Sequence, residues 1–456
     1  MKARRGASKI IPWMGLAVVL AAVGGLIWFS AWVTGYLHSE AFRRLAAAKT
    51  GDALHASVNF GPFRWTGSSV FVEECDATGA ENSVIGSLAA SELRADMNWR
   101  SLLHGVWRIE RIEMLRLNAS FLPAEAGKIP PSAPPATPAP SGLAGLLPQK
   151  FEVGEVAAAS ANLKFPLPTG NEFLTAEETR LVARSDSGGW EFSGGGGTLA
   201  VPVVGTLGIT DYRVRLQGDE VFIGDSHFSV GSAGKLSLFG QWGTDSRLNL
   251  SWSQVDVAQI LPPDWKTRIS GALGGSCIFQ PAGNGSDNGS WKASGEFKLT
   301  GGRLESFPLL DRLASFSSSP EFAHLPLDEV SGKFDRSPAG LVVTDFLLES
   351  KGFLRVESDR VVADGKLSGT FRVGVGAPAL RWLPGDRIFS APRDGYLWTE
   401  MKVDGTPQDP REDLSARLTA AIEEAAVRKA SDFLGTPPAL PAPAEKILNN
   451  LLNPSP

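Results

Sequence analysis

The sequence predicts a mainly β protein: an N-terminal transmembrane helix, a long antiparallel sheet, short helices and a C-terminal amphipathic helix. Three observations predict this class. An uncharged run near the N-terminus is long enough to cross a membrane. Apolar and polar residues alternate over much of the remaining chain, which is typical of strands with one apolar face. Long helical stretches are not interleaved with the alternating segments, so an antiparallel meander is favoured over a parallel βαβ sheet.

The composition excludes several classes of protein. Lys and Arg number 44 and Asp and Glu 49, for a net charge of -5, which argues against a nucleic-acid partner. The aromatic residues comprise 24 Phe and 13 Trp but only 3 Tyr, so much of the aromatic surface favours burial or lipid. Five His and two Cys, all far apart, support neither a zinc site nor a disulfide-rich scaffold.

The segment 10–36 is predicted to anchor the chain in a membrane. Residues 11–33 form a run of 23 uncharged residues, about 34 Å long as a helix, which exceeds a hydrocarbon core of roughly 30 Å. Basic residues in the tail 1–9 predict a cytoplasmic N-terminus, with the bulk of the chain outside. A cleaved signal peptide is the alternative, but its apolar region is usually shorter; both interpretations export the remainder.

The segment 37–121 is predicted to contain a helix and then strands. Ser39 is a good N-cap for a short helix, and Gly51 is expected to end it. The proline-rich segment 122–149 follows, and it is predicted to be a linker because proline cannot donate to a strand ladder.

The segment 150–408 is predicted to be the main β-rich domain. From Phe151 to Phe165 the apolar residues take odd positions, and only Glu155 breaks the series. Further alternation occurs around Tyr212, Val214 and Leu216, and the segments are separated by glycine-containing turns. Adjacent acids such as Glu177 and Glu178 are expected to point to opposite faces of a strand.

The segment 409–456 is predicted to be helical, with a tail. Asp409 is a candidate N-cap, Pro410 a candidate first helical residue, and Glu412 a candidate partner that completes the cap. An apolar stripe that begins at Leu414 and Leu418 then predicts an amphipathic helix that packs on the sheet.

These features together resemble the AsmA-like family of membrane-anchored proteins of the bacterial periplasm. The resemblance depends on the anchor and on an ordered series of short patterns in the sequence, namely FRRL at 42–45, FRWTG at 63–67, NWRSLLHG at 98–105, WRIERIEMLRL at 107–117, GRL at 302–304, and VDGTP at 403–407. It implies a long, twisted antiparallel sheet curled into a groove with an apolar inner face. It also implies a role in outer-membrane lipid homeostasis, with lipid moving through the periplasm.

The apolar face of the predicted sheet can be covered in two ways. A sheet with one apolar face must cover that face, and the predicted helices are too few to do so. Either the strands pack as two sheets around a filled core, or the sheet curls and holds lipid chains. The candidate lipid-groove residues are Leu236, Leu238, Leu248, Leu250, Trp252, Phe371, Val373 and Val375.

The sequence contains none of the common catalytic or metal-binding motifs. There is no G-x-S-x-G elbow, no H-E-x-x-H and no Walker A loop, so no catalytic, cofactor-binding or metal-ligating residue is assigned. The glycines at 194–197 are expected to form a hairpin loop. The resemblance, together with the scarcity of helices to cover the sheet, makes a lipid-binding protein of the inner membrane, with its C-terminal bulk in the periplasm, the leading hypothesis. Its expected partners are phospholipid or another lipid, and other envelope proteins. A non-enzymatic envelope scaffold with a closed core is the alternative, and an exported enzyme ranks below both.

Overall fold

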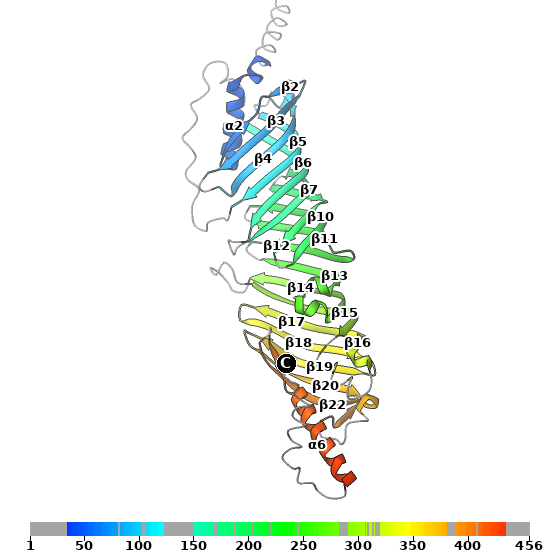
Figure 1. Cartoon of the computed structure of the whole chain (residues 1–456). Helices are drawn as coiled ribbons and strands as arrows, with labels where there is room; N and C mark the ends of the chain where they lie inside the picture. The colour runs from blue at the N-terminus through cyan, green and yellow to red at the C-terminus, as the bar shows by residue number, and fades with distance from the viewer. Residues whose placement is uncertain are drawn as a thin grey trace, which may run out of the picture. The chain divides into compact units, whose positions relative to one another are not determined.

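The computed structural model describes most of the chain between residues 34 and 434 (Figure 1). The described ranges are 34–80, 83–102, 106–122, 150–167, 172–186, 188–202, 204–218, 220–243, 246–261, 263–281, 291–305, 307, 310–311, 314, 320–380, 388–406 and 409–434. Two compact units divide the chain, Met1–Leu248 and Asn249–Pro456. The predicted mainly β class is confirmed in both.

The predicted anchor, 10–36, lies almost wholly outside the described residues, as do most of the linker 122–149 and the tail after residue 434. Among the residues that the structure describes, no helix combines the length and apolarity needed to span a membrane.

The sheet of the N-terminal unit is mixed and mostly antiparallel. Its paired strands run from β1 through β3, β4, β5, β6 and β7 to β8 and β9, and then through β10 and β11 to β12, with β2 also on β3. The strands are β1 (Ala56–Phe60), β2 (Arg64–Thr66), β3 (Ser69–Gly79), β4 (Ile85–Asn98), β5 (Val106–Phe121), β6 (Lys150–Pro166), β7 (Phe173–Asp186), β8 (Gly189–Gly195), β9 (Thr198–Val201), β10 (Gly205–Gln217), β11 (Glu220–Val230) and β12 (Gly234–Trp242).

One pairing corrects the prediction of an antiparallel meander. Strands β5 and β6 run parallel, in register from Val106 opposite Lys150 to Ser120 opposite Lys164. A parallel pair needs a long crossover connection, whereas an antiparallel pair can be joined by a tight turn. In the sequence, the proline-rich segment 122–149 lies between these two strands, and all of it after residue 122 is outside the described residues.

Helix α2 (Glu40–Leu54) packs at one end of this unit. Ser39 caps it as predicted, because its hydroxyl accepts a hydrogen bond from the Phe42 N–H at 3.3 Å. The helix continues three residues past Gly51, contrary to the prediction, and ends at His55 in the left-handed conformation. Phe42 is buried against Trp107 of β5, while α3 (Trp99–Leu102) forms the short turn between β4 and β5.

Shifts in strand register change which residues face the core. The predicted odd-position series on β6 does not hold, since Ala158 and Ala161 are buried and Ala159 is exposed. Strand β6 matches β5 residue for residue, and the buried positions of β5 shift in the same way, at Met114 and Leu117. Bulges bend strands and increase their twist, so these shifts curve the sheet.

Gly196 and Gly197 connect two consecutive strands within the sheet and do not form the expected hairpin loop. Strands β8 and β9 both lie between β7 and β10, and Gly196 and Gly197 join them with φ of 80° and 73°. A Cβ at Gly197 would lie 2.1 Å from the Glu177 carbonyl oxygen of β7. Only glycine fits this connection, because it combines positive φ with close backbone contact.

The C-terminal unit is also built on an antiparallel sheet, whose strands pair in the order β14, β15, β17, β18, β19, β20 and β22. Its strands are β14 (Ile269–Pro281), β15 (Trp291–Glu305), β16 (His324–Leu327), β17 (Glu329–Ser337), β18 (Gly340–Ser350), β19 (Leu354–Ala363), β20 (Leu367–Gly376), β21 (Ala391–Arg393), β22 (Tyr396–Gly405) and β23 (Pro410–Glu412), while β13 (Arg247–Asp256) crosses the unit boundary.

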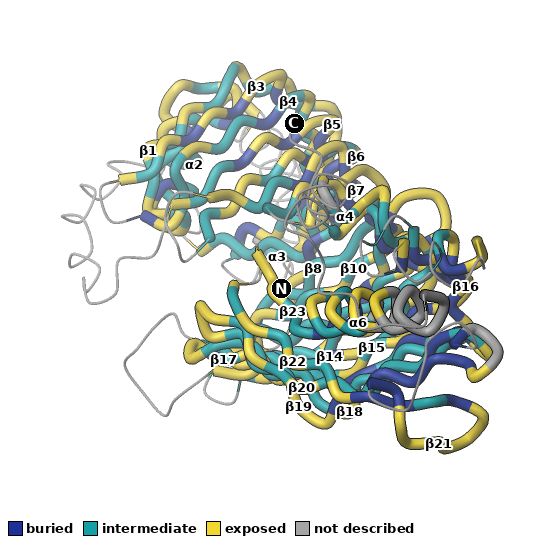
Figure 2. The backbone as a smooth tube through the Cα atoms, turned by 60° about the horizontal axis from the view of Figure 1, so that its bottom comes forward, coloured by how far each residue is buried: buried dark blue, intermediate teal, exposed yellow. Residues whose placement is uncertain are grey.

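A second layer covers one face of the C-terminal sheet and closes a core. Val373 and Val375 of β20 are 1% and 0% exposed. They pack with Phe322 of the 3₁₀ helix Pro320–Ala323, with Phe389, and with Leu414 of helix α6 (Leu414–Leu434). Figure 2 shows the concentration of buried backbone near β16. A 3₁₀ helix, an irregular segment and the first turns of α6 thus supply the cover of this face.

The start of α6 corrects the predicted cap. Residues Pro410–Glu412 are strand β23, paired with β22, so the helix begins only at Leu414. The Glu412 carboxylate accepts a hydrogen bond from the Ser415 N–H at 2.8 Å. The predicted apolar stripe is confirmed at Leu414 and Leu418, which are both buried.

Aromatic rings lie over glycines of neighbouring strands at several places in this unit. A Cβ at Gly275 would lie 2.6 Å from the Trp252 ring, and one at Gly332 would lie 2.9 Å from the Phe297 ring. A Cβ at Gly374 would lie 2.9 Å from the Trp398 ring. Each glycine leaves the space that its ring fills, which ties adjacent strands together.

Candidate functional site

The N-terminal unit carries a continuous apolar face across β6, β7, β8, β10, β11 and β12. Residues paired directly across strands point to the same face. One row of paired residues is Val156, Ala183, Phe192, Val214 and Ile223; the next is Ser185, Trp190, Leu216, Val221 and Trp242. These two rows, with Ile209, Phe228 and Leu236, are named the apolar face.

The apolar face is incompletely covered by the described chain. Leu216 is 37% and Trp242 41% exposed, and Phe192, Val214 and Ile223 are half-buried. The described helices of this unit, α2 and α3, contact β1 and β5. Large apolar side chains that stay partly exposed over several adjacent strands are typical of a surface that binds an apolar partner.

Small side chains make up the part of the apolar face that lies towards β3 and β4. Alanines at 90, 119, 158, 161 and 176 are all buried, with Cys75 beside them. The surface therefore changes from small residues near β5 to aromatic residues near β8 and β11.

The structure separates the predicted lipid-groove residues into two sets. Leu236 and Leu238 lie on β12 and are half-buried, with Leu236 opposite Phe228 of β11. Leu248, Leu250 and Trp252 lie on β13 and are also half-buried.

The second set lies in a different environment. Phe371, Val373 and Val375 belong to β20 and to the closed core of the C-terminal unit. The sequence analysis missed Trp190, Phe192 and Ile223. The alternation at Tyr212, Val214 and Leu216 was the available signal, because it marks the strand beside them.

The opposite face of the N-terminal sheet is polar, and charged residues of alternating sign line one row of it. Arg111, Glu155, Arg184, Glu191 and Arg215 are successive cross-strand partners. Glu155 contacts the guanidinium nitrogens of Arg111 at 3.0 Å and Arg184 at 2.8 Å. The hydrogen bond from Arg184 lowers the pKa of the Glu155 carboxyl, although desolvation opposes it. The residue that broke the predicted apolar series thus anchors the polar face.

Replacing Glu155 with glutamine is expected to destabilise the N-terminal unit by about 1 kcal/mol or less at pH 7. Because the pKa of Glu155 is lower in the folded state, its contribution is present above the unfolded pKa of about 4.3 and disappears as pH falls through the folded pKa. Urea denaturation at pH 7 and pH 3 measures this difference, with the exposed Glu220→Gln as control. An equal loss at both pH values would contradict the expectation.

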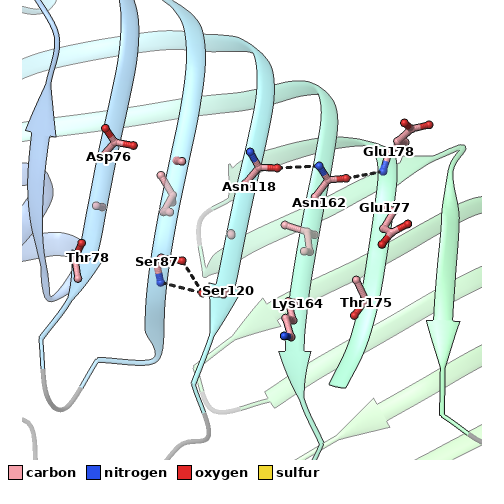
Figure 3. Close-up of a pocket in the computed structure, with 15 residues that line it drawn as sticks. Asp76, Thr78, Ser87, Asn118, Ser120, Asn162, Lys164, Thr175, Glu177 and Glu178 are labelled. Atoms are coloured by element: carbon pink, nitrogen blue, oxygen red, sulfur yellow. Dashed lines mark hydrogen bonds between the residues drawn. The ribbon is translucent and has the colours of Figure 1, made fainter. Parts of the chain in front are cut away.

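A polar hollow of about 670 Å³ lies on this face (Figure 3). The Asn162 side chain donates to the Asn118 Oδ1 at 2.8 Å, and its Oδ1 accepts from the Glu178 N–H at 2.9 Å. Glu177 and Glu178 both line the hollow, contrary to the predicted opposite orientation, because Glu178 adopts a φ of 55° at a strand irregularity. The two hydrogen bonds of Asn162 fix the bend between β6 and β7.

The two cysteines are both free and buried, Cys75 in β3 and Cys277 in β14. Burial raises the pKa of each thiol to about 11. They belong to different units and behave as small core residues with little thiolate at neutral pH.

Within the described ranges, no group of three His, Cys, Asp or Glu side chains is placed to hold a metal ion. The apolar face offers contact with an apolar ligand, and the polar face offers hydrogen bonding and ion pairing.

In comparisons with known proteins, no family model, no curated protein and no solved structure matches the chain.

Proposed function

We propose that the chain binds the acyl chains of phospholipid, or of another lipid, on the apolar face of its N-terminal unit. The observation that carries the proposal is the pair of cross-strand rows through Phe192 and Trp190, whose large apolar side chains remain partly exposed. We further propose an AsmA-like protein anchored in the bacterial inner membrane, with its C-terminal bulk in the periplasm. There it would bind or move lipid and support outer-membrane homeostasis.

The physical basis is the burial of hydrocarbon. An acyl chain gains about 0.8 kcal/mol for each CH₂ group removed from water. The rows of the apolar face cross the strands, which are spaced about 4.8 Å apart, so the path from β6 to β12 covers about 24 Å. One acyl chain spans about half of the roughly 30 Å hydrocarbon thickness of a bilayer, so this path is long enough to hold it along its whole length. No catalytic role is proposed.

Lipid extraction tests the proposal directly. The detergent-solubilised chain, purified from a bacterial membrane, is expected to retain phospholipid after washing, as detected by mass spectrometry of the extract. A photoreactive amino acid at Val221, on the apolar face, is expected to cross-link to lipid. The same probe at Phe222, which faces the other side of β11, should cross-link much less. Equal labelling at both positions, or no lipid in the extract, would contradict the proposal.

An envelope scaffold is the second candidate. The closed core around Val373 and Phe322 favours it for the C-terminal unit, because that sheet already has its cover. The two candidate functions differ in whether the N-terminal unit binds lipid, and the cross-linking experiment distinguishes them.

A further inference from the structure

The polar hollow of the N-terminal unit reaches the border of the sheet where β5 and β6 end and β4 and β7 begin (Figure 3). Residues paired directly across strands form its outermost row, namely Thr78, Ser87, Ser120, Lys164 and Thr175. Four of these five side chains carry a hydroxyl, and the fifth carries a positive charge. Hydroxyl donors beside a cation suit a phosphate group. This row is named the rim site.

The rim site has hydrogen-bond donors that the described protein groups leave free. The Ser120 hydroxyl accepts a hydrogen bond from the Ser87 N–H at 3.1 Å, and the two hydroxyl oxygens lie 2.7 Å apart. Whichever hydroxyl donates within this pair, the hydrogen of the other one remains available. The Lys164 Nζ lies 4.1 Å from the centroid of the Phe173 ring, and among the described residues no carboxylate forms an ion pair with it. Ser120 and Lys164 are direct partners on adjacent strands, so both can contact one phosphate.

Apolar side chains lead from the apolar face to the same border of the sheet. They continue from Ile209 by one cross-strand row, namely Leu207, Leu199, Ala176 and Leu163. Phe165 lies two residues beyond this row on β6, is 36% exposed, and stacks on the Phe121 ring with 4.6 Å between the centroids. Lys164 is its neighbour in the strand, so its side chain points to the opposite face. The apolar path therefore ends beside the rim site, separated from it only by the edge of the sheet.

We propose that the rim site binds the headgroup of a phospholipid that carries both a phosphate and an amine, while its acyl chains lie on the apolar face. This inference rests on the proposed function, because the same apolar face holds the chains. The phosphate contacts Lys164 and the Ser87–Ser120 hydroxyl pair. The amine contacts the Glu177 carboxylate, which lines the same hollow two residues along β7 from the row of Lys164, a distance of about 7 Å.

The charges around the hollow favour a headgroup with an amine over one that is only negative. Among the described residues that line it, one is a lysine and three carry carboxylates, at Asp76, Glu177 and Glu178. Neither Lys164 nor Glu177 forms an ion pair with another described residue. Negative charge alone would be repelled by the carboxylates, whereas an amine is attracted to them. A headgroup with both charges therefore matches the two unpaired charges of the hollow.

The binding of three lipids with identical acyl chains tests this inference, in the full chain in detergent after removal of bound lipid. Phosphatidylethanolamine, phosphatidylglycerol and diacylglycerol are offered in equal amounts in mixed micelles, and bound lipid is measured by mass spectrometry. Phosphatidylethanolamine is expected to bind about fivefold more than either of the others. The reason is that phosphatidylglycerol lacks the amine and diacylglycerol lacks both charges.

Two substitutions separate the contributions of the two charges. Lys164→Met removes the positive charge but keeps an unbranched side chain, so binding of phosphatidylethanolamine is expected to fall about fivefold while that of diacylglycerol stays the same. Lys164→Arg should retain most of the binding. Glu177→Gln should abolish the preference for phosphatidylethanolamine over phosphatidylglycerol. The matched control is Lys235→Met, an exposed lysine on β12 of the same unit, which should change none of the three.

Each contrary result has a distinct meaning. Equal binding of the three lipids by the unchanged chain would overturn the rim site and leave the proposed binding of acyl chains intact, whereas binding of none of them would overturn both. An equal loss of all three lipids in Lys164→Met would show that Lys164 supports the fold and does not contact a headgroup. Glycerophosphoethanolamine, which lacks acyl chains, should displace the lipid only weakly. Complete displacement at equal concentration would overturn a lipid as the occupant, in favour of a soluble phosphate ester.

Discussion

Replacing Val373 with aspartate is expected to unfold the C-terminal unit. Val373 is 1% exposed and packs with Phe322, Phe389 and Leu414 in a closed core. An unpaired carboxylate there must either lose its hydration or take up a proton, and the expected cost is about 4 kcal/mol. Thermal melting and urea denaturation of the purified chain measure the loss, and a disappearance of the C-terminal transition is the expected signature.

The matched control is Val362→Asp on the adjacent strand. Val362 is half-buried and lines the hollow on the polar face, so a carboxylate there stays in water. Its expected cost is about 1 kcal/mol or less. Comparable destabilisation by the two substitutions would show that the loss comes from strand propensity and not from burial.

Replacing Ile223 with aspartate is expected to reduce lipid retention strongly while it destabilises the fold only slightly. Ile223 is half-buried on the apolar face, opposite Val214 and beside the glycine at 240. When no lipid is bound, water reaches this position, so the unit should stay folded with a loss of about 1–2 kcal/mol. Lipid retention should fall at least fivefold, because a charge at the contact disfavours hydrocarbon.

Phe222→Asp is the control for this change. Phe222 lies next to Ile223 on the same strand but faces the polar side, opposite Arg215. It should leave lipid retention near the unchanged level. Unfolding of the N-terminal unit by Ile223→Asp, with no lipid on the unchanged chain, would favour a filled core and the scaffold hypothesis.

These two aspartate substitutions show how far the sequence could predict the fold. Alternation identified strands in both units, and Leu236 and Val373 occur in equally good apolar series. Their environments differ because the cover on Val373 comes from Phe322, Phe389 and Leu414, which are distant in sequence. A local pattern shows which side of a strand is apolar, but it does not show what packs against that side.

Other differences between the predictions and the structure arise from backbone geometry that the alternation of apolar and polar residues does not encode. The parallel pairing of β5 and β6 depends on where a chain returns after a long connection. The shift that buries Ala158 in place of Ala159 comes from a register change between β6 and β7. Glu155 was the visible trace of that shift, because a charged residue in an apolar series indicates that the strand has changed its orientation.

The aromatic rings that lie over glycines have a consequence for how this chain can vary. A methyl group at Gly332 would collide with the Phe297 ring, and a smaller residue at Phe297 would leave a void above Gly332. Each change alone is expected to destabilise the sheet, and the two together are expected to compensate each other. The pairs Phe297–Gly332 and Trp398–Gly374 are therefore epistatic units, whereas a Cβ at Gly275 would also lie 2.3 Å from the Glu296 carbonyl oxygen. Drift at one member of a pair should be accompanied by compensating drift at the other member, on the neighbouring strand.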